Sequence, residues 1–282
     1  MERTDKKQGN GNNNRGWKTA CVLFLAGALV CTAVACAGKE NQSQSEEEYK
    51  NLAERTAATP EPEGETPADT QEDATPEPTE APEEKDPLAV LEEMGVPIPD
   101  KTVDFADLQE NTNADIYAWI YIPDTKVDYP VLQHPTDNTY YLNYNLDGSR
   151  GYPGFTDPNT VVYGHNMKNG TMFAGLHKYS DSQYLEEHPY VYVYTEEGLL
   201  VYEIFAAYES TDEHILYAHD WFGDRKVFGK YIEEILDMRS MGSVLKEGAE
   251  VTADSRILTM STCISSKPNN RFLVQGVLLN GE

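Results

Sequence analysis

From residue 116 onward the chain is a series of short β-prone runs separated by turn signals, and this pattern limits the fold more than any other feature. Runs rich in Val, Ile and Tyr alternate with Gly, Pro, Asn and Asp, which is typical of an all-β sandwich or barrel. The expected strands are 116–122, 127–132, 160–163, 190–195, 199–205, 257–260 and 271–279. Helical spacing of apolar residues occurs at 87–95, 105–110, 138–144, 171–179 and 227–236. We therefore predict a mainly β, barrel-like domain with peripheral helices.

Residues 39–86 are too acidic and too poor in apolar side chains to form a packed core. They contain sixteen Asp and Glu but four Lys and Arg, a net charge of −12 out of −26 for the chain. Such a segment buries too little apolar surface to offset its ordering entropy, so we predict a disordered linker. The acidity argues against a nucleic acid partner. Residues 87–282 are numerous enough for one domain with a substantial core.

The N-terminus carries a targeting pattern. Five Lys and Arg lie within residues 1–18, and the uncharged run 19–38 is just long enough to span a bilayer as a helix. Basic residues before the run and acidic ones after it predict a cytoplasmic N-terminus and an extracellular body. Two alternatives stay open: a cleaved signal peptide, and a lipoprotein whose box Ala33-Val-Ala-Cys36 would be cleaved before the cysteine. Each of them exports the domain.

Cys263 is the only cysteine of the exported part, because Cys21, Cys31 and Cys36 lie within or at the end of the apolar run. An intramolecular disulfide is thereby excluded in that part. A lone cysteine in an oxidising compartment is either a small buried core residue or a reactive thiol. We expect Cys263 to lie where the strand 257–260 ends. The segment 264–270 is expected to be a loop, so that Arg271, on the next strand, faces the thiol.

His165 follows the buried strand 160–163 and Gly164, which allows a sharp turn. A rigid sheet would hold a catalytic base well at such a strand end, although a histidine taken alone is more often structural than catalytic. The other histidine pair, His214 and His219, lacks a metal-ligand spacing, so no metal or cofactor is expected. The apolar stripe within 171–179 is expected to belong to the core.

A thiol, an imidazole and a guanidinium are together sufficient for acyl transfer. A thiolate attacks a carbonyl, a guanidinium stabilises the oxyanion, and an imidazolium protonates the leaving amine. Cys263, Arg271 and His165 supply these groups. About 100 residues separate Cys263 from His165, so the sequence pattern cannot show that they meet.

These motifs resemble those of class B sortases. The resemblance rests on Tyr163-Gly-His-Asn-Met167 with the helix after it, on Thr259-Met-Ser-Thr-Cys263 and on Arg271, and it covers the chain from Pro87 to the C-terminus. It implies an eight-stranded sortase β-barrel and a membrane-bound cysteine transpeptidase. It also implies that Cys263 is the nucleophile, His165 the general acid and base, and Arg271 the oxyanion stabiliser.

The resemblance further implies a substrate and a pocket. The enzyme would cleave a C-terminal sorting signal similar to Asn-Pro-x-Thr after its Thr and transfer the acyl group to the amine of a cell-wall precursor peptide, so that surface proteins are anchored. The residues that match pocket positions are Asn138, Leu142, Tyr217, Ser261 and Thr262.

The sequence departs from the class B pattern at two places. Met260 replaces the usual Leu, a change that conserves volume. The segment 147–158 is shorter than usual, so that one barrel strand is expected to be shortened or missing. Two other functions stay open: a thiol hydrolase that uses water as the acceptor, and a non-catalytic surface lipoprotein that binds peptides or wall fragments.

Overall fold

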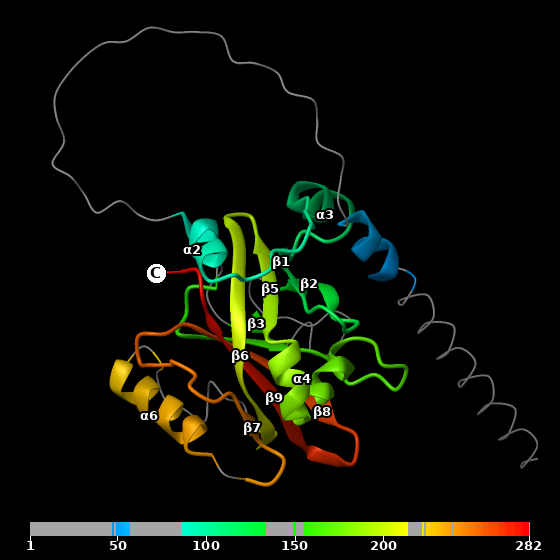
Figure 1. The fold of residues 1–282 in the computed structure, drawn as a ribbon. Coiled ribbons are helices and arrows are strands. Elements are labelled where there is room, and N and C mark those ends of the chain that lie inside the picture. The colour runs from blue at the N-terminus through cyan, green and yellow to red at the C-terminus, as the bar shows by residue number, and fades with distance from the viewer. Residues whose placement is uncertain are drawn as a thin grey trace, which may run out of the picture. The chain divides into compact units, whose positions relative to one another are not determined.

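The computed structural model describes residues 47, 49–56, 86–133, 149–150, 155–213, 222, 224–238 and 240–281. The chain divides into two compact units, residues 1–50 and 51–282. All the strands described belong to the second unit (Figure 1).

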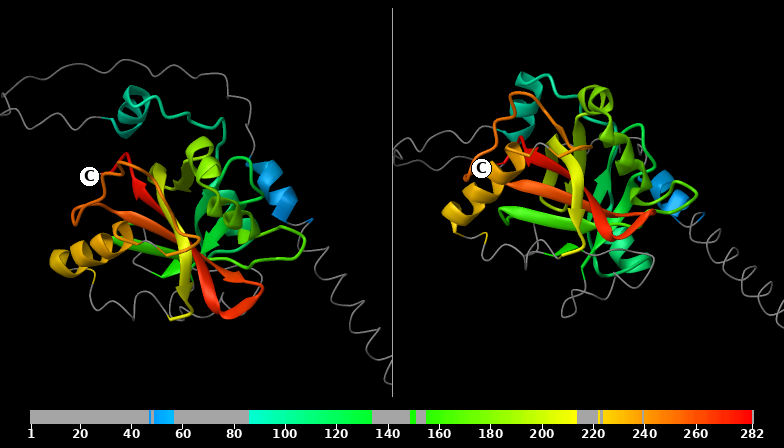
Figure 2. Two further views of the ribbon diagram at one scale, coloured as in Figure 1. Left: turned by 60° about the horizontal axis from the view of Figure 1, so that its bottom comes forward. Right: turned by 90° about the horizontal axis from the view of Figure 1, so that it is seen from below.

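One sheet forms the body of this unit, and it curls into a half-barrel (Figure 2). Within the described ranges it has nine strands, in the order β2-β1-β5-β6-β9-β8-β4-β3, with β7 paired to β6 off this path. Their bounds are β1 Ile116–Tyr121, β2 Asp128–Leu132, β3 Ser149–Arg150, β4 Asn159–Tyr163, β5 Tyr190–Thr195, β6 Gly198–Thr211, β7 Val244–Leu245, β8 Ile257–Ile264 and β9 Lys267–Leu278. Every neighbouring pair is antiparallel except β4 and β8, which run parallel.

The predicted mainly β fold is confirmed, since each of the seven expected runs is a strand. The described residues form nine strands, one more than the eight that the resemblance implied. The two that were not among the seven expected runs are β3 and β7, which have two residues each and are too short to produce a periodic pattern. The short segment 147–158 contains β3, which pairs with β4. Its residues 147–148 and 151–154 lie outside the described part.

The expected loop 264–270 is wrong. The ladder between β8 and β9 continues past Cys263 to the pair Ile264 and Lys267, so that a tight hairpin replaces the loop. The two Asn and the Pro of this segment suggested a loop. However, the ladder between β9 and β6 reaches the pair Asn270 and Thr211, and the Asp212 N–H donates to the Asn269 carbonyl at 3.0 Å, so two residues of this polar stretch are held beside β6.

Peripheral helices cover the sheet. They are α2 Pro87–Glu93, α3 Phe105–Asn111, the 3-10 helix η2 Phe173–Ser180, α4 Ser182–Glu187 and α6 Arg225–Leu236. The α6 helix buries Phe228, Tyr231, Ile232 and Ile235 in a core that includes Val161 of β4, Phe205 of β6, Ile257 of β8 and Leu273 of β9. This confirms the predicted amphipathic helix. The predicted helix 138–144 lies outside the described residues.

Part of the predicted disordered linker is ordered. Residues 51–55 are helical, and Leu52 and Thr56 are buried. This stretch contains helix formers and no Pro, unlike the Pro-rich sequence after it, which lies outside the described residues.

No helix among the described residues is long and apolar enough to cross a membrane. The expected anchor, 19–38, also lies outside the described part.

A buried chain of hydrogen bonds connects β4, β8 and β9 to α6. The Thr259 hydroxyl donates to Asn159 Oδ1 at 2.8 Å, and Gln275 Nε2 donates to Thr259 Oγ1 at 2.8 Å. Gln275 Nε2 also donates to the Tyr231 hydroxyl at 2.8 Å, while Tyr208 donates to Gln275 Oε1 at 3.1 Å. Burial raises the pKa of both tyrosines, so they stay neutral. Because a buried polar group is costly without a partner, this network favours one register between the strands.

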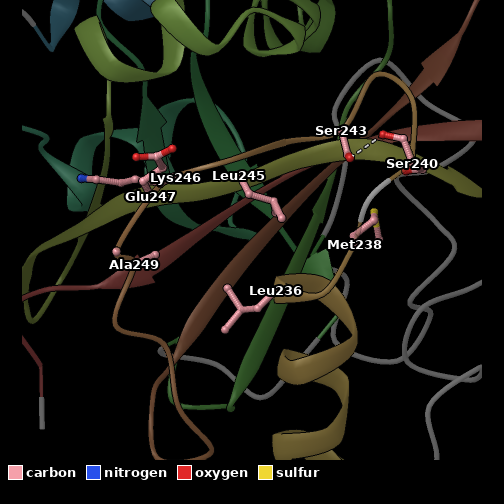
Figure 3. Close-up of a pocket in the computed structure, with 9 residues that line it drawn as sticks. Leu236, Met238, Ser240, Ser243, Leu245, Lys246, Glu247 and Ala249 are labelled. Atoms are coloured by element: carbon pink, nitrogen blue, oxygen red, sulfur yellow. Dashed lines mark hydrogen bonds between the residues drawn. The ribbon is translucent and has the colours of Figure 1, made fainter.

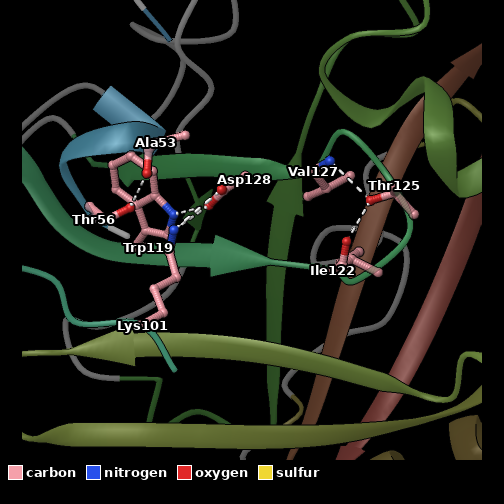
Figure 4. A network of polar contacts seen from close by, with 8 residues as sticks. All are labelled: Ala53, Thr56, Lys101, Trp119, Ile122, Thr125, Val127 and Asp128. Atoms are coloured by element: carbon pink, nitrogen blue, oxygen red, sulfur yellow. Dashed lines mark hydrogen bonds and ion pairs between the residues drawn. The ribbon is translucent and has the colours of Figure 1, made fainter. Parts of the chain in front are cut away.

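A second polar cluster attaches the segment before α3 to the sheet (Figure 4). Asp128 Oδ1 accepts a hydrogen bond of 2.6 Å from the Trp119 indole and lies 3.0 Å from Lys101 Nζ. The Lys101 side chain is only 7% exposed, and its ammonium lies over the Trp119 and Tyr121 rings. A charge at such a site needs its partner.

We expect Asp128→Ala to lower the free energy of unfolding by about 2–4 kcal/mol, because it leaves the Lys101 ammonium and the indole N–H buried without an acceptor. Urea denaturation measures the change. The matched control is Asp254→Ala, which removes the partner of the exposed Arg225 and should cost less than about 1 kcal/mol. Equal losses in the two variants would contradict the analysis.

Candidate active site

Cys263 lies near the end of β8, as predicted, and its side chain is exposed. Along β8 side chains alternate between the two faces of the sheet, so Cys263 shares a face with Ile257, Thr259 and Ser261. Ile257 packs in the core under α6. The thiol therefore lies on the face that α6 covers, at the uncovered end of the strand.

Arg271 lies directly opposite Cys263 in the antiparallel ladder between β8 and β9. Directly opposed residues project their side chains to the same face, with Cβ atoms about 5 Å apart. The predicted meeting of Cys263 and Arg271 is confirmed at the level of the backbone. The Arg271 Nη1 donates to the carbonyls of Pro268 and Asn270, each at 3.0 Å. These bonds orient the guanidinium and leave the hydrogens of Nε and Nη2 for another acceptor.

His165 reaches the same place through the parallel pairing of β4 and β8. Tyr163 is paired with Ser261, and the ladder continues with a 3.0 Å bond from the Gly164 N–H to the Ser261 carbonyl. Two residues further along the chain on each side are His165, past the end of β4, and Cys263, still within β8. The register thus leads the backbone of His165 toward the end of β8 that carries Cys263, although 98 positions separate the two residues.

The turn after β4 is tightly constrained. A Cβ atom at Gly164 would lie 2.3 Å from the Phe173 ring, so only glycine fits without movement. The Phe173 N–H donates to the His165 carbonyl at 2.9 Å, and Asn166 pairs with Met172 in an isolated bridge. Met172 has φ of 54° and ψ of −132°, an unusual conformation for a residue with a side chain. Strained backbone of this kind is concentrated at functional sites.

Two side chains that the sequence analysis did not single out as site residues contact Cys263. Asn166 Nδ2 donates to the Cys263 carbonyl at 2.9 Å, and His177 Nε2 lies 3.1 Å from the same oxygen. Asn166 belongs to the motif already noted around His165. His177 lies in η2, where the apolar stripe indicated core packing and gave no signal for a polar contact with β8.

The other predicted site residues have different outcomes. Ser261 and Thr262 are both buried, at 2% exposure. By the alternation along β8, Ser261 shares the face of Cys263 while Thr262 points to the opposite face. Asn138, Leu142 and Tyr217 lie outside the described residues, and a role in substrate binding stays a prediction for all five.

A hollow in the described part of the chain lies elsewhere. It lies between the end of α6 and β7, has a volume of about 570 Å³, and is lined by Leu236, Met238, Ser240, Ser243, Leu245, Lys246, Glu247, Gly248 and Ala249 (Figure 3). It includes none of the three candidate catalytic residues.

In the described part of the chain, no three His, Cys, Asp or Glu side chains gather in a way that could hold a metal ion.

We expect Gly164→Ala to lower both the activity and the free energy of unfolding, the latter by about 1–3 kcal/mol, because the methyl group displaces Phe173 and the turn that carries His165. Gly229→Ala in α6 is the matched control. Its Cβ would lie 3.3 Å from that of Ala253 and gains helix propensity, so stability should change by less than about 1 kcal/mol. Urea denaturation and turnover assays measure the two effects. Full activity in Gly164→Ala would contradict the role given to this turn.

Comparison with known proteins identifies the family of this chain. The Sortase domain family matches residues 120–279 of the chain. Sortase B of Listeria monocytogenes is 38% identical over 188 residues, which cover 61% of this chain and 73% of the relative. Sortase B of Staphylococcus aureus is 30% identical over 164 residues, 55% of this chain and 65% of the relative.

The solved structures agree with these sequence matches. The X-ray structure of Clostridium perfringens sortase B superimposes with a TM-score of 0.55 and 28% identity, covering 62% of this chain and 99% of that one. The matched region includes β4, β8 and β9, and with them His165, Cys263 and Arg271. The chain therefore belongs to the sortase family of cysteine transpeptidases and is a sortase of class B.

Proposed function

We propose that this sortase cleaves an Asn-Pro-x-Thr-like sorting signal after its Thr and transfers the acyl group to the amine of a cell-wall precursor peptide, with Cys263, His165 and Arg271 as the catalytic residues. The observation that supports it most directly is the strand register. The pairing of β8 with β9 sets Arg271 opposite Cys263, and the pairing of β4 with β8 leads His165 to the same end of the sheet.

In the first step the Cys263 thiolate attacks the carbonyl carbon of the Thr, and the carbonyl oxygen becomes an oxyanion. The Nε and Nη2 hydrogens of Arg271 donate to this charge, while its Nη1 stays bonded to the carbonyls of Pro268 and Asn270. The C–N bond then breaks. The imidazolium of His165 gives its proton to the leaving amine, and a thioester remains on Cys263.

The second step reverses these roles. The acceptor amine attacks the thioester carbonyl, neutral His165 takes the proton of the amine, and the Cys263 thiolate leaves. An amide bond forms between the surface protein and the wall peptide, and the protonated imidazole is ready for the next substrate. Water in place of the amine would give hydrolysis, which the same three residues could perform.

The full-length chain incubated with peptides varied around Asn-Pro-x-Thr, with and without amine acceptors, tests the proposal. Mass spectrometry should detect a peptide joined to the amine and cleavage after the Thr. The motif that gives the highest kcat/KM identifies the sorting signal. Cleavage that is independent of every added amine would instead support the hydrolase, and no cleavage of any peptide would overturn the proposal.

We expect Cys263→Ala to abolish turnover and Arg271→Lys to lower kcat by about 10²–10³-fold, because lysine cannot present the guanidinium's fork of donors to the oxyanion. The matched control is Arg225→Lys, in an exposed ion pair with Asp254, which should leave kcat within about twofold of the parent. Steady-state kinetics with the best peptide measures both. An unchanged kcat in Arg271→Lys would refute the oxyanion role.

The proposed location is the outer face of the membrane, with residues 19–38 as a single-pass anchor and 39–86 as the linker. Its support is the apolar run with basic residues before it and acidic ones after it.

We expect Cys36→Ala to leave the chain in the membrane fraction, because an uncleaved helix does not depend on that thiol. Loss of the variant from membranes would favour the lipoprotein anchor through Cys36.

A further inference from the structure

The carbonyl oxygen of Cys263 is contacted by two side chains outside the catalytic set. Asn166 Nδ2 lies 2.9 Å from it and His177 Nε2 lies 3.1 Å from it. His177 Nε2 also lies 3.0 Å from Asn166 Nδ2, so its role follows the tautomer of the ring. With the proton on Nε2 the ring donates to the carbonyl oxygen, and with the proton on Nδ1 it accepts from the Asn166 amide that holds this oxygen.

This oxygen needs such donors because the sheet ends beside it. The rungs between β4 and β8 recur every two residues, so the rung after the Gly164–Ser261 bond would join the Asn166 N–H to the Cys263 carbonyl. However, β4 ends at Tyr163, and the backbone of Asn166 is paired with Met172. The side-chain amide of Asn166 therefore replaces the missing backbone donor, and His177 Nε2 contacts both the amide and the oxygen.

On its other side the nucleophile also lies at a break in the ladder. The register between β8 and β9 shifts between Cys263 and Ile264. Backbone at such an irregularity has fewer ladder bonds to hold it. Asn166 Nδ2 also lies 3.3 Å from Ser265 Oγ, so the amide contacts both sides of this break.

His177 approaches from the face opposite to the thiol. Its ring stacks on Phe272 at 4.9 Å with 27° between the planes, and Phe272 lies next to Arg271 in β9. Side chains alternate along β9, so Phe272 points away from the face that Cys263 and Arg271 share. From this side His177 reaches the backbone of the nucleophile.

We infer that Asn166 and His177 are positioning residues, which clamp the Cys263 carbonyl and thereby fix the direction of its Cα–Cβ bond toward His165 and Arg271. The inference rests on the proposed function, since it concerns the same thiol. Without the clamp the sulfur occupies more orientations, and a small misplacement of a nucleophile has a large effect on the rate of its reaction. Binding of the substrate should be little affected.

The test compares His177→Phe, which keeps a ring on Phe272 without the donor, with His177→Gln, whose Nε2 can reach the same oxygen. In the full-length chain, His177→Phe should lower kcat for peptide cleavage by about five- to tenfold, the effect of one hydrogen bond, with KM within about twofold of the parent. His177→Gln should restore kcat to within about threefold of the parent. Asn166→Asp, which turns an acceptor toward the carbonyl, should lose at least as much as His177→Phe.

A second readout is independent of the sorting reaction. Iodoacetamide alkylation of Cys263, followed on the tryptic peptide from Ile257 to Arg271, should be slower in His177→Phe than in the parent and restored in His177→Gln, because a sulfur that occupies more orientations lies less often beside the Arg271 guanidinium. His188→Gln, at a histidine whose Nδ1 pairs with Asp124, is the control and should keep the parent rate. Melting temperatures verify that each variant is folded.

Parent values of kcat and alkylation rate in folded His177→Phe would overturn the inference, as would equal losses in His177→Phe and His177→Gln. If the parent cleaves none of the peptides, the proposed function fails. The alkylation rates alone would then decide whether the clamp exists.

Discussion

The parallel pairing of β4 with β8 is the constraint on which the site depends. It is the one parallel ladder among the described strands, and it joins segments almost 100 residues apart. Parallel neighbours bring the ends of both strands to the same edge of a sheet. His165 follows the end of β4 by two residues and Cys263 lies one residue before the end of β8, so the site forms only when this long-range pairing forms.

Buried hydrogen bonds within the sheet fix this register. Thr259, four residues before Cys263, bonds to Asn159 of β4 and accepts from Gln275 of β9 within the core. A slip of one residue would turn these groups to the opposite face and leave buried donors unpaired. Thr259 of the cysteine motif therefore contributes to the geometry of the site although it lies in the interior.

Backbone and side-chain geometry at the site have different origins. The strands set the positions of the backbone at Cys263 and Arg271, while local contacts at the hairpin end of β9 and in the turn after β4 orient the side chains. The hairpin carbonyls of Pro268 and Asn270 hold the Arg271 guanidinium. Close packing of Gly164 on Phe173 shapes the turn that presents His165. Placement of the backbone by strands and of the side chains by local contacts is expected where a reactive geometry must be held within a fraction of an ångström.

Local sequence determined much of this protein. Periodicity predicted the seven longer strands and the α6 helix, and the lone Cys263 with its motif predicted the nucleophile and its family. Tertiary structure decided what no local pattern encodes. The polar stretch 264–270 forms a hairpin because the ladder between β8 and β9 continues through it, and β6 pairs with its last residue, Asn270. The ladder between the distant segments β4 and β8 leads His165 to the end of the sheet that carries Cys263. The contact of His177 with the Cys263 carbonyl arises in the same way, because it depends on where a strand ends and not on the residues around it.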